Sequence, residues 1–255
     1  VGLVLSKSNV VVSENGTQTD TFTVKLNSEP TDNVTVNLSL NSSDEFTVSS
    51  NLSFSSSNWY TTQTVTLTGV NDNVSDDNQT STLTLSSSSS DSYYNGLSDN
   101  VTVTTTDNDT VGLVLSGTNA TVSENGTTST FTVRLNSAPT ANVTLSLSDN
   151  DTTEVLASPT TLTFSSGNWS TSQLIMLTGV DDNVSDDNQT TLLTLTPSGG
   201  DYSGLTAPTV TITTIDNDTV GLILSKTAAT VSESGTTDTF AVKLNSEPTD
   251  NVTVS

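Results

Sequence analysis

The chain has 255 residues and a formal net charge of -23, with five Lys and Arg residues, no His and no Cys. The lack of Cys excludes disulfides and thiolate chemistry, and the lack of His removes the commonest general base and transition-metal ligand. So much negative charge argues against nucleic acids and anionic membrane surfaces as partners, and it makes a divalent cation the natural counter-charge.

The sequence also indicates whether the chain carries targeting segments, membrane spans or disordered regions. The sequence has no signal peptide, no run of about 18 apolar residues and no initiator Met at Val1. We therefore expect a piece of a longer chain, cut near a repeat boundary, with no membrane span in this segment. Abundant Ser, Thr and Asn are compatible with disorder, but the strict alternation described below argues against it.

The chain repeats itself with a long period. VGLVLS begins at Val1 and Val111, and VGLILS begins at Val220, which gives a period of about 110 residues. This is the length of a small domain. The heptapeptide DNDTVGL at Asp107 and Asp216 leaves no Gly-rich or Pro-rich linker at the joints. The expected domains are 1–110, 111–219 and the start of a truncated third copy, 220–255.

Within one copy, apolar and polar residues alternate with the period of a β-strand. In the stretch 33–41, Val34, Val36, Leu38 and Leu40 share one face, and Asn, Thr and Ser occupy the other. The strands expected in the first copy are 2–6, 10–13, 19–27, 33–41, a weak one at 45–54, 61–70, 79–87 and 100–107. The pattern predicts an all-β fold: tandem seven-stranded antiparallel β-sandwiches, Greek-key and immunoglobulin-like, joined end to end with almost no linker.

Aromatic residues are few and dispersed. Trp59 and Trp169 each lie in a turn before a strand, and we expect them to pack over the core rather than bind a ligand. Tyr93, Tyr94 and Tyr202 are the candidates for an aromatic ligand site.

Strand parity places the acidic turns at one end of each sandwich, because successive turns of an antiparallel sandwich alternate between its two ends. In the first copy these acids are Glu14, Asp44, Glu45, Asp72, Asp76, Asp77, Asp107 and Asp109. In the second copy they are Glu124, Asp149, Asp151, Glu154, Asp181, Asp182, Asp186, Asp187, Asp216 and Asp218, and Glu233 begins the series in the third. Calcium takes about 6–8 oxygen ligands in flexible geometry, so the set predicts Ca²⁺ sites.

Asp and Asn are also common in turns for local hydrogen bonding alone, and that alternative remains open. The convergence of four separate loops favours metal binding. DNVSDDN lacks the Gly and the closing Glu of an EF-hand loop. Ions held by Asp107 and Asp109 would stiffen the joint with the next copy, and their removal would let it hinge.

With these motifs, the sequence resembles tandem Calx-beta domains, as found in large secreted or cell-surface bacterial repeat proteins. The matching features are VSENGT, FTVKLNSEPTDNVTV, LSFSSSNWYTTQTVTLTGVNDN and VTVTTTDND, in that order. The resemblance implies calcium ligands at Glu14, Asp44 or Glu45, Asp72 with Asp76 or Asp77, and Asp107 with Asp109. The sequence departs from the family pattern at Asn108 and Asn217, which lie between terminal acids, and at Asn71, which becomes Asp181 in the second copy.

We therefore expect a structural, non-enzymatic extracellular array: a calcium-rigidified spacer or stalk of a secreted or cell-surface adhesin or filament. The alternative is an adhesion module that binds glycan or protein through its loops. A carboxylate-dependent glycoside hydrolase is disfavoured by the repetition, and a cytosolic calcium sensor by the tandem copies without a distinct partner.

The expected partners are the neighbouring repeats of the same chain, with self-association into a fibre left open. Asn-X-Ser/Thr occurs about 18 times, which leaves two interpretations open: glycan modification, or sequons that are copied with the rest of the repeat.

Overall fold

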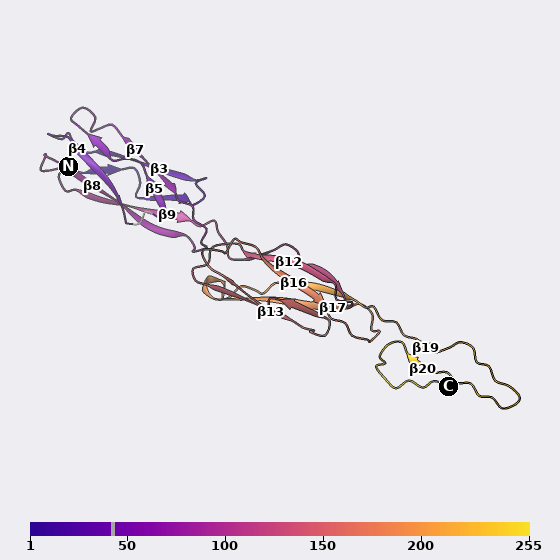
Figure 1. Cartoon of the computed structure of the whole chain (residues 1–255). Helices are drawn as coiled ribbons and strands as arrows, with labels where there is room; N and C mark the ends of the chain where they lie inside the picture. Colours follow the sequence, from indigo (N-terminus) through magenta and orange to yellow (C-terminus); the bar gives the residue numbers. More distant parts are fainter. Residues whose placement is uncertain (42–43) are drawn as a thin grey trace. The chain divides into compact units, whose positions relative to one another are not determined.

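The computed structural model describes residues 1–41 and 44–255. The chain forms two compact units, Val1–Thr110 and Val111–Ser255 (Figure 1). Within the described ranges, the search for a helix long and apolar enough to cross a bilayer found none.

The first unit is a sandwich of two sheets. The five-stranded sheet has the order β2 (Asn9–Ser13), β9 (Ser98–Thr106), β8 (Gln79–Ser89), β4 (Val34–Leu40) and β6 (Leu52–Phe54). The four-stranded sheet has the order β1 (Leu3–Leu5), β3 (Thr19–Leu26), β7 (Gln63–Gly69) and β5 (Phe46–Val48). The all-β sandwich predicted from the alternation is therefore confirmed.

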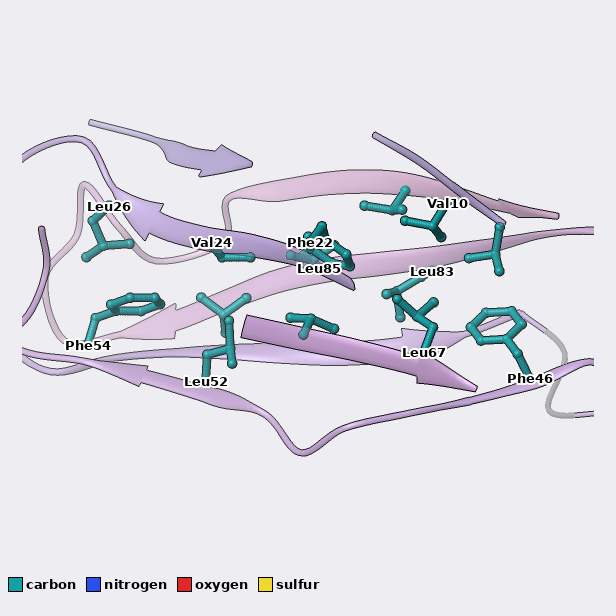
Figure 2. Close-up of a cluster of buried hydrophobic side chains, with 14 of the residues drawn as sticks. Val10, Phe22, Val24, Leu26, Phe46, Leu52, Phe54, Leu67, Leu83 and Leu85 are labelled. Carbon is teal, nitrogen blue, oxygen red and sulfur yellow. The ribbon is translucent and has the colours of Figure 1, made fainter. Parts of the chain in front are cut away.

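The apolar faces of the two sheets meet in one core. Figure 2 shows side chains from both layers pointing into the space between them, among them Phe22, Phe46 and Phe54. These three residues are at most 1% exposed. Trp59 packs against this core, and its carbonyl oxygen accepts a hydrogen bond from the Leu26 N–H at 3.0 Å. The packing role expected for Trp59 is confirmed.

One expected strand is divided between the two sheets. The weak strand at 45–54 becomes β5 in one sheet and β6 in the other. Asn51, just before β6, accepts a hydrogen bond from the Leu38 N–H and donates to Asn37, so it pins the crossing chain to β4. The expected strands 2–6 and 10–13 are present as β1, in the four-stranded sheet, and β2, in the five-stranded sheet. The pairing of β2 with β9 is parallel, whereas the other strand pairs described in the first unit are antiparallel.

Asp20 of β3 bridges the two sheets of the first unit. Its Oδ1 accepts a hydrogen bond from Lys7 Nζ at 2.5 Å, and its Oδ2 accepts one from the Val11 N–H at 3.1 Å. The corresponding positions are Lys226 and Asp238 in the third copy, which also form an ion pair, and Gly117 and Ser129 in the second.

The second unit repeats this architecture. Its five-stranded sheet has the order β11 (Asn119–Ser123), β18 (Thr209–Ile215), β17 (Gln189–Ser198), β13 (Val143–Asp149) and β15 (Thr161–Phe164). Its four-stranded sheet has the order β10 (Leu113–Leu115), β12 (Thr128–Leu135), β16 (Gln173–Gly179) and β14 (Val155–Ser158), and a 3-10 helix spans Gly200–Tyr202. Trp169 packs against its core, as expected. The segment 220–255 adds β19 (Leu222–Leu224), paired with β20 (Val242–Leu244).

Two of the three tyrosines considered as ligand-binding residues are core residues instead. Tyr94 is 1% exposed and Tyr202 is not exposed. The Tyr94 hydroxyl donates to the Ser28 carbonyl oxygen and accepts from the Ser28 N–H, and Tyr202 bonds Ser137 in the same way. The expectation that these two could contact a ligand is wrong, because the long side chain fills the end of the sandwich.

Candidate metal centre

Three acids of the first unit meet at one end of its sandwich. Glu14 lies in the turn between β2 and β3, Asp72 follows β7, and Asp109 follows β9. Each offers a carboxylate oxygen, and these oxygens lie within 4.8 Å of one another. Glu14 is only 3% exposed, while Asp72 and Asp109 are partly buried. We call this set the first acidic centre.

The turn that carries Glu14 is held between neighbouring strands. The Glu14 N–H donates to the Thr106 carbonyl oxygen at 3.2 Å, at the end of β9. On the other side, the Ser13 carbonyl oxygen packs onto Gly69, where an added Cβ would lie 2.2 Å from it. The backbone contacts therefore fix the Glu14 side chain at the end of the core.

Asp107 organises the loop that follows β7. Its Oδ2 accepts hydrogen bonds from the N–H groups of Asp76 and Asp77, both at 3.1 Å. Its Oδ1 accepts one from the Asp109 N–H at 2.6 Å, and Asn78 accepts one from the Asp107 N–H. Asp77 takes a left-handed conformation with φ 63°, which Asp tolerates better than most residues.

Glu14 is in an electrostatically costly position. Burial, followed by the charges of the nearby Asp72 and Asp107 carboxylates, raises its pKa to about 7, and a hydrogen bond from the Asn108 N–H offsets part of the rise. Its Oε2 is buried and has no hydrogen-bond partner among the described residues. A buried carboxylate oxygen without a hydrogen-bond partner favours either a proton or a cation.

The neighbouring acids share this environment. Burial raises the pKa of Glu45, with the Asp76 carboxylate adding to the effect. Burial, followed by the charges of Asp107 and Asp72, raises the pKa of Asp109. The pKa of Asp76 is also raised by burial, and its Oδ1 is a second buried oxygen without a partner in the described chain.

The second unit has a corresponding acidic centre. Carboxylate oxygens of Glu124, Asp216 and Asp218 lie within 4.8 Å of one another. Glu124 is 1% exposed, and its Oε2 accepts a hydrogen bond from the Asn217 N–H at 3.1 Å. Burial raises the pKa of Glu124 despite this hydrogen bond, with a contribution from the Asp216 charge.

Glu154 extends the second centre. It is 5% exposed, and its Oε2 is buried without a described partner. Burial, followed by the charges of Asp186, Asp151 and Glu124, raises the pKa of Glu154 to about 7. Asp186 Oδ1 is likewise buried and unpartnered. The charges on Glu154 and Glu124 are thus coupled within one centre.

Most of the other acids predicted as ligands take part in local charge interactions or hydrogen bonds. Asp44 raises the pKa of Glu45 by its charge. Burial raises the pKa of Asp149, and the Asp151 charge adds to it. Hydrogen bonds from backbone or side-chain groups reach Asp151 (from Thr153), Asp181 (from Asn217) and Asp182 (from Val184), and the Asp187 N–H donates to Asp216. Glu233 is exposed in a turn of 220–255, and the metal-binding groups identified among the described residues do not include it.

Some residues that shape these centres were not predicted from the sequence. Gly69 and Gly179 allow the backbone at the ends of β2 and β11 to approach closely. A Cβ added at Gly69 would lie 2.2 Å from the Ser13 carbonyl oxygen, and one added at Gly179 would lie 2.1 Å from that of Ser123. The signal was present, because the sequence Leu-Thr-Gly-Val recurs at both positions. The backbone N–H groups of Asn108 and Asn217 bond Glu14 and Glu124, which no side-chain pattern could reveal.

The donor set suits a hard cation. All the converging groups are carboxylates, and the ion pairs found among the described residues, Lys7–Asp20 and Lys226–Asp238, involve no acid of either centre. Oxygen-only donors of this kind match Ca²⁺ or Mg²⁺ rather than softer transition metals. The residues present therefore fit a divalent cation that neutralises the clustered charge.

The chain is similar to known proteins in its domain family and, more weakly, to several solved structures. The model of the Calx-beta domain family matches residues 2–109 and 106–219. Two similar solved structures are the calcium binding domain CBD12 of CALX1.1, at 14% identity and TM-score 0.37, and CBD12 from CALX1.2, at 13% and 0.35. Each alignment covers 83% of this chain and 99% of the other. The D0-D1 domain of intimin aligns at 15% identity and TM-score 0.27, over 84% of this chain and 97% of that one. The search of curated proteins found no match.

Proposed function

Because the chain belongs to the Calx-beta domain family, we propose that each of its two sandwiches binds calcium at its acidic centre. The observation that carries this proposal is the buried, unpartnered Oε2 of Glu14 among the carboxylates of Asp72, Asp109 and Asp107. Calcium supplies the missing charge, and its coordination number leaves room for backbone and Asn oxygens.

The ligands proposed for the first unit are Glu14 and the acids linked to it directly or through Asp72 and Asp76: Glu45, Asp72, Asp76, Asp107 and Asp109. Those proposed for the second unit are Glu124, Glu154, Asp182, Asp186, Asp216 and Asp218. Asp77 and Asp187 contribute chiefly through their backbone N–H groups, which hold Asp107 and Asp216.

We further propose that calcium makes the chain a stiff spacer in an extracellular or cell-surface array, such as the stalk of an adhesin. The first unit ends at Thr110 and the second begins at Val111, so no linker separates them along the chain. Asp107 and Asp109 lie directly before this boundary, and calcium held there restrains the last residues of the first unit. Extracellular calcium modules bind with dissociation constants of about 10⁻⁴ to 10⁻³ M, which suits this setting.

The test is thermal unfolding of the full chain in millimolar calcium, in EDTA and in magnesium. Calcium at about 10 times its dissociation constant stabilises a binding unit by about 1.4 kcal/mol. We expect a calcium-specific rise in midpoint that Asp107→Asn with Asp109→Asn removes from the first unit. Asp32→Asn, which removes an exposed acid on the turn before β4, serves as the matched control and retains the rise.

Stiffness needs a separate measurement, because ions can stabilise a unit without restraining the joint. Small-angle X-ray scattering should show a narrower distribution of inter-unit distances in calcium than in EDTA. Equal distributions in both buffers, together with a calcium-dependent midpoint, would retain calcium binding and refute the spacer role.

A further inference from the structure

One Asn-Val-Thr triplet is common to all three copies of the repeat. It begins at Asn33, Asn142 and Asn251, at the end of the turn that precedes β4, β13 and the corresponding stretch of the third copy. Between the first two copies the surrounding sequence changes from SEPTDNVTV to SAPTANVTL, whereas the triplet stays the same. We call Asn33, Asn142 and Asn251 the turn asparagines.

The fold does not explain why these residues are asparagines. Asn is favoured in turns because its side chain bonds the local backbone, or because it tolerates a left-handed conformation. Among the hydrogen bonds of residues 1–41 and 44–255, none involves the side chain of a turn asparagine. The left-handed residues other than Gly in these ranges are Asp77 and Asp187. Neither usual reason for an Asn therefore applies to the turn asparagines.

A second Asn position shows the opposite pattern. Asn58 and Asn168 each accept a hydrogen bond from the N–H of the Ser three residues earlier, at 2.6 Å, and each donates to a strand carbonyl oxygen. Two residues further on, the first copy has Tyr60 and the second has Ser170, so only Asn168 lies in an Asn-X-Ser/Thr triplet. Where the Asn holds the fold, the third residue varies. At the turn asparagines, which do not hold the fold, Asn and Thr recur together.

The triplets present both of their polar side chains to solvent. Asn33 and Thr35 are exposed, and so are the corresponding Asn142 and Thr144. The Val between them has no exposed surface in either unit. This follows from strand alternation, because residues two apart lie on the same side of a strand. A group attached to the amide nitrogen of the Asn would therefore extend into water without disturbing the core.

The turn asparagines of the two units lie at the end of each sandwich opposite to the acidic centre. β4 begins directly after Asn33 and runs towards the turn that carries Glu45, and β13 runs from Asn142 towards Glu154 in the same way. The 7 residues of β4, at about 3.3 Å each, separate the two ends by roughly 20 Å. A bulky group on a turn asparagine thus leaves the acidic centre open to a cation.

Other recurring Asn-X-Ser/Thr triplets have a role within the acidic centres. The side chains of Asn78 and Asn188 accept hydrogen bonds from the N–H groups of the first acid after β9 and after β18. In the triplets that begin at Asn73 and Asn183, the Ser hydroxyl donates to the carbonyl oxygen of an acid of the centre. The structure therefore accounts for these triplets without a modification, in contrast to the turn asparagines.

We propose that the turn asparagines are acceptor sites for N-linked sugar. Asn Nδ2 forms a bond to the anomeric carbon of a sugar, the bond from that carbon to the diphosphate of a lipid-linked donor breaks, and Nδ2 gives one proton to the leaving diphosphate. The Thr two residues further on completes the acceptor triplet. The proposal rests on the extracellular setting proposed above, because such triplets are modified in secreted proteins, and it does not depend on calcium.

Peptide mapping of the chain exported by the cells that produce it tests the proposal. Peptide N-glycosidase in heavy-oxygen water leaves a labelled aspartate in place of each Asn that carried a sugar. We expect the label at Asn33, Asn142 and Asn251. Asn78 and Asn188 serve as matched controls in the same molecule, and we expect no label there, because their side chains hold the acidic centres.

Two variants separate the hydroxyl of the triplet from its size. Thr35→Ala is expected to lose the label at Asn33, and Thr35→Ser is expected to retain it, with Asn142 as the internal reference in both. An exported chain without label at the turn asparagines overturns the proposal and leaves the extracellular role standing. Equal labelling of Asn78 and Asn33 also overturns it, because sequons that are merely copied would be modified alike. A chain found only inside the cell refutes the extracellular setting and this proposal together.

Discussion

The carbonyl oxygen of Ser13 packs so closely onto Gly69 that a Cβ there would lie 2.2 Å from it. Ser13 precedes Glu14, and Gly69 ends β7, just before the loop that carries Asp72. Two of the loops that form the first acidic centre are thus set at a fixed distance by backbone contact.

Gly179→Ala, at the corresponding position of the second unit, is expected to destabilise that unit by roughly 1–3 kcal/mol, because a Cβ would clash with a backbone oxygen. It should also weaken calcium binding there by moving Glu124. Gly204→Ala is the control, since no atom lies within 4 Å of a Cβ built at Gly204. Chemical denaturation and calcium titration measure both effects; equal stability of the two variants would contradict the expectation.

Glu14→Gln is expected to have opposite effects with and without calcium. In EDTA at pH 8, the variant removes a buried charge that burial and like charges disfavour, and we expect stabilisation of about 1–3 kcal/mol. In calcium, it removes a ligand, and the calcium-dependent rise of the first unit should be largely lost. Thermal unfolding in both buffers checks this, with Glu29→Gln of an exposed turn as control. A loss of stability in EDTA would mean that the Glu14 carboxylate has another partner.

The metal-free chain is expected to become less stable as the pH rises from about 4.5 to about 7. The folded-state pKa of Glu14 is raised from 4.5 to about 7, and that of Glu154 likewise. The folded state therefore holds more protons than the unfolded state in this window, and the stability present below pH 4.5 is lost as the pH passes the folded pKa.

Calcium should reverse this trend, because it competes with protons for the same carboxylates and its stabilising effect grows with pH. Asp20 and Asp91 act in a different window, since their lowered pKa values contribute stability that is lost only as the pH falls below about 3.8. Unfolding midpoints at several pH values, in calcium and in EDTA, separate the two effects. A metal-free midpoint that rises between pH 5 and 7 would contradict the assignment.

Much of the fold could be predicted from the sequence, because alternation directly records which face of a strand is buried. The stretch 33–41 became β4, Val34–Leu40, with Val34 and Val36 fully buried. The division of 45–54 could not be predicted, since it depends on hydrogen bonds from Asn51 to a strand distant in sequence.

The acidic centres were predictable in outline. Strand parity placed the acidic turns at one end, and the structure brings Glu14, Asp72 and Asp109 together there. Strand parity does not indicate, however, how deeply each acidic side chain is buried. The burial of Glu14 and Glu154 follows from neighbouring backbone contacts, whereas Asp44 stays exposed in a turn with a similar sequence signal.

Tyr94→Phe is expected to destabilise the first unit by about 1–2 kcal/mol. The substitution removes the hydroxyl that donates to the Ser28 carbonyl oxygen at 2.6 Å and leaves the partly buried backbone groups of Ser28 without this partner. Tyr93→Phe is the adjacent control, because Tyr93 is 76% exposed and should be nearly neutral. Urea unfolding compares the two, and equal effects would argue against a buried role for the Tyr94 hydroxyl.

The parallel pairing of β2 with β9, and of β11 with β18 in the second unit, determines how each sandwich responds to a pulling force. In the five-stranded sheet of the first unit, β2 is the first strand along the chain and β9 is the last. Five residue pairs join these two strands, from Asn9–Thr102 to Ser13–Thr106. Opposite pulls on the two ends slide parallel strands along each other, so their hydrogen bonds share the load instead of opening one at a time. Asp20 adds a tie to Lys7 and Val11 in the first sandwich that Gly117 and Ser129 cannot provide in the second. The second sandwich should therefore yield at the lower force.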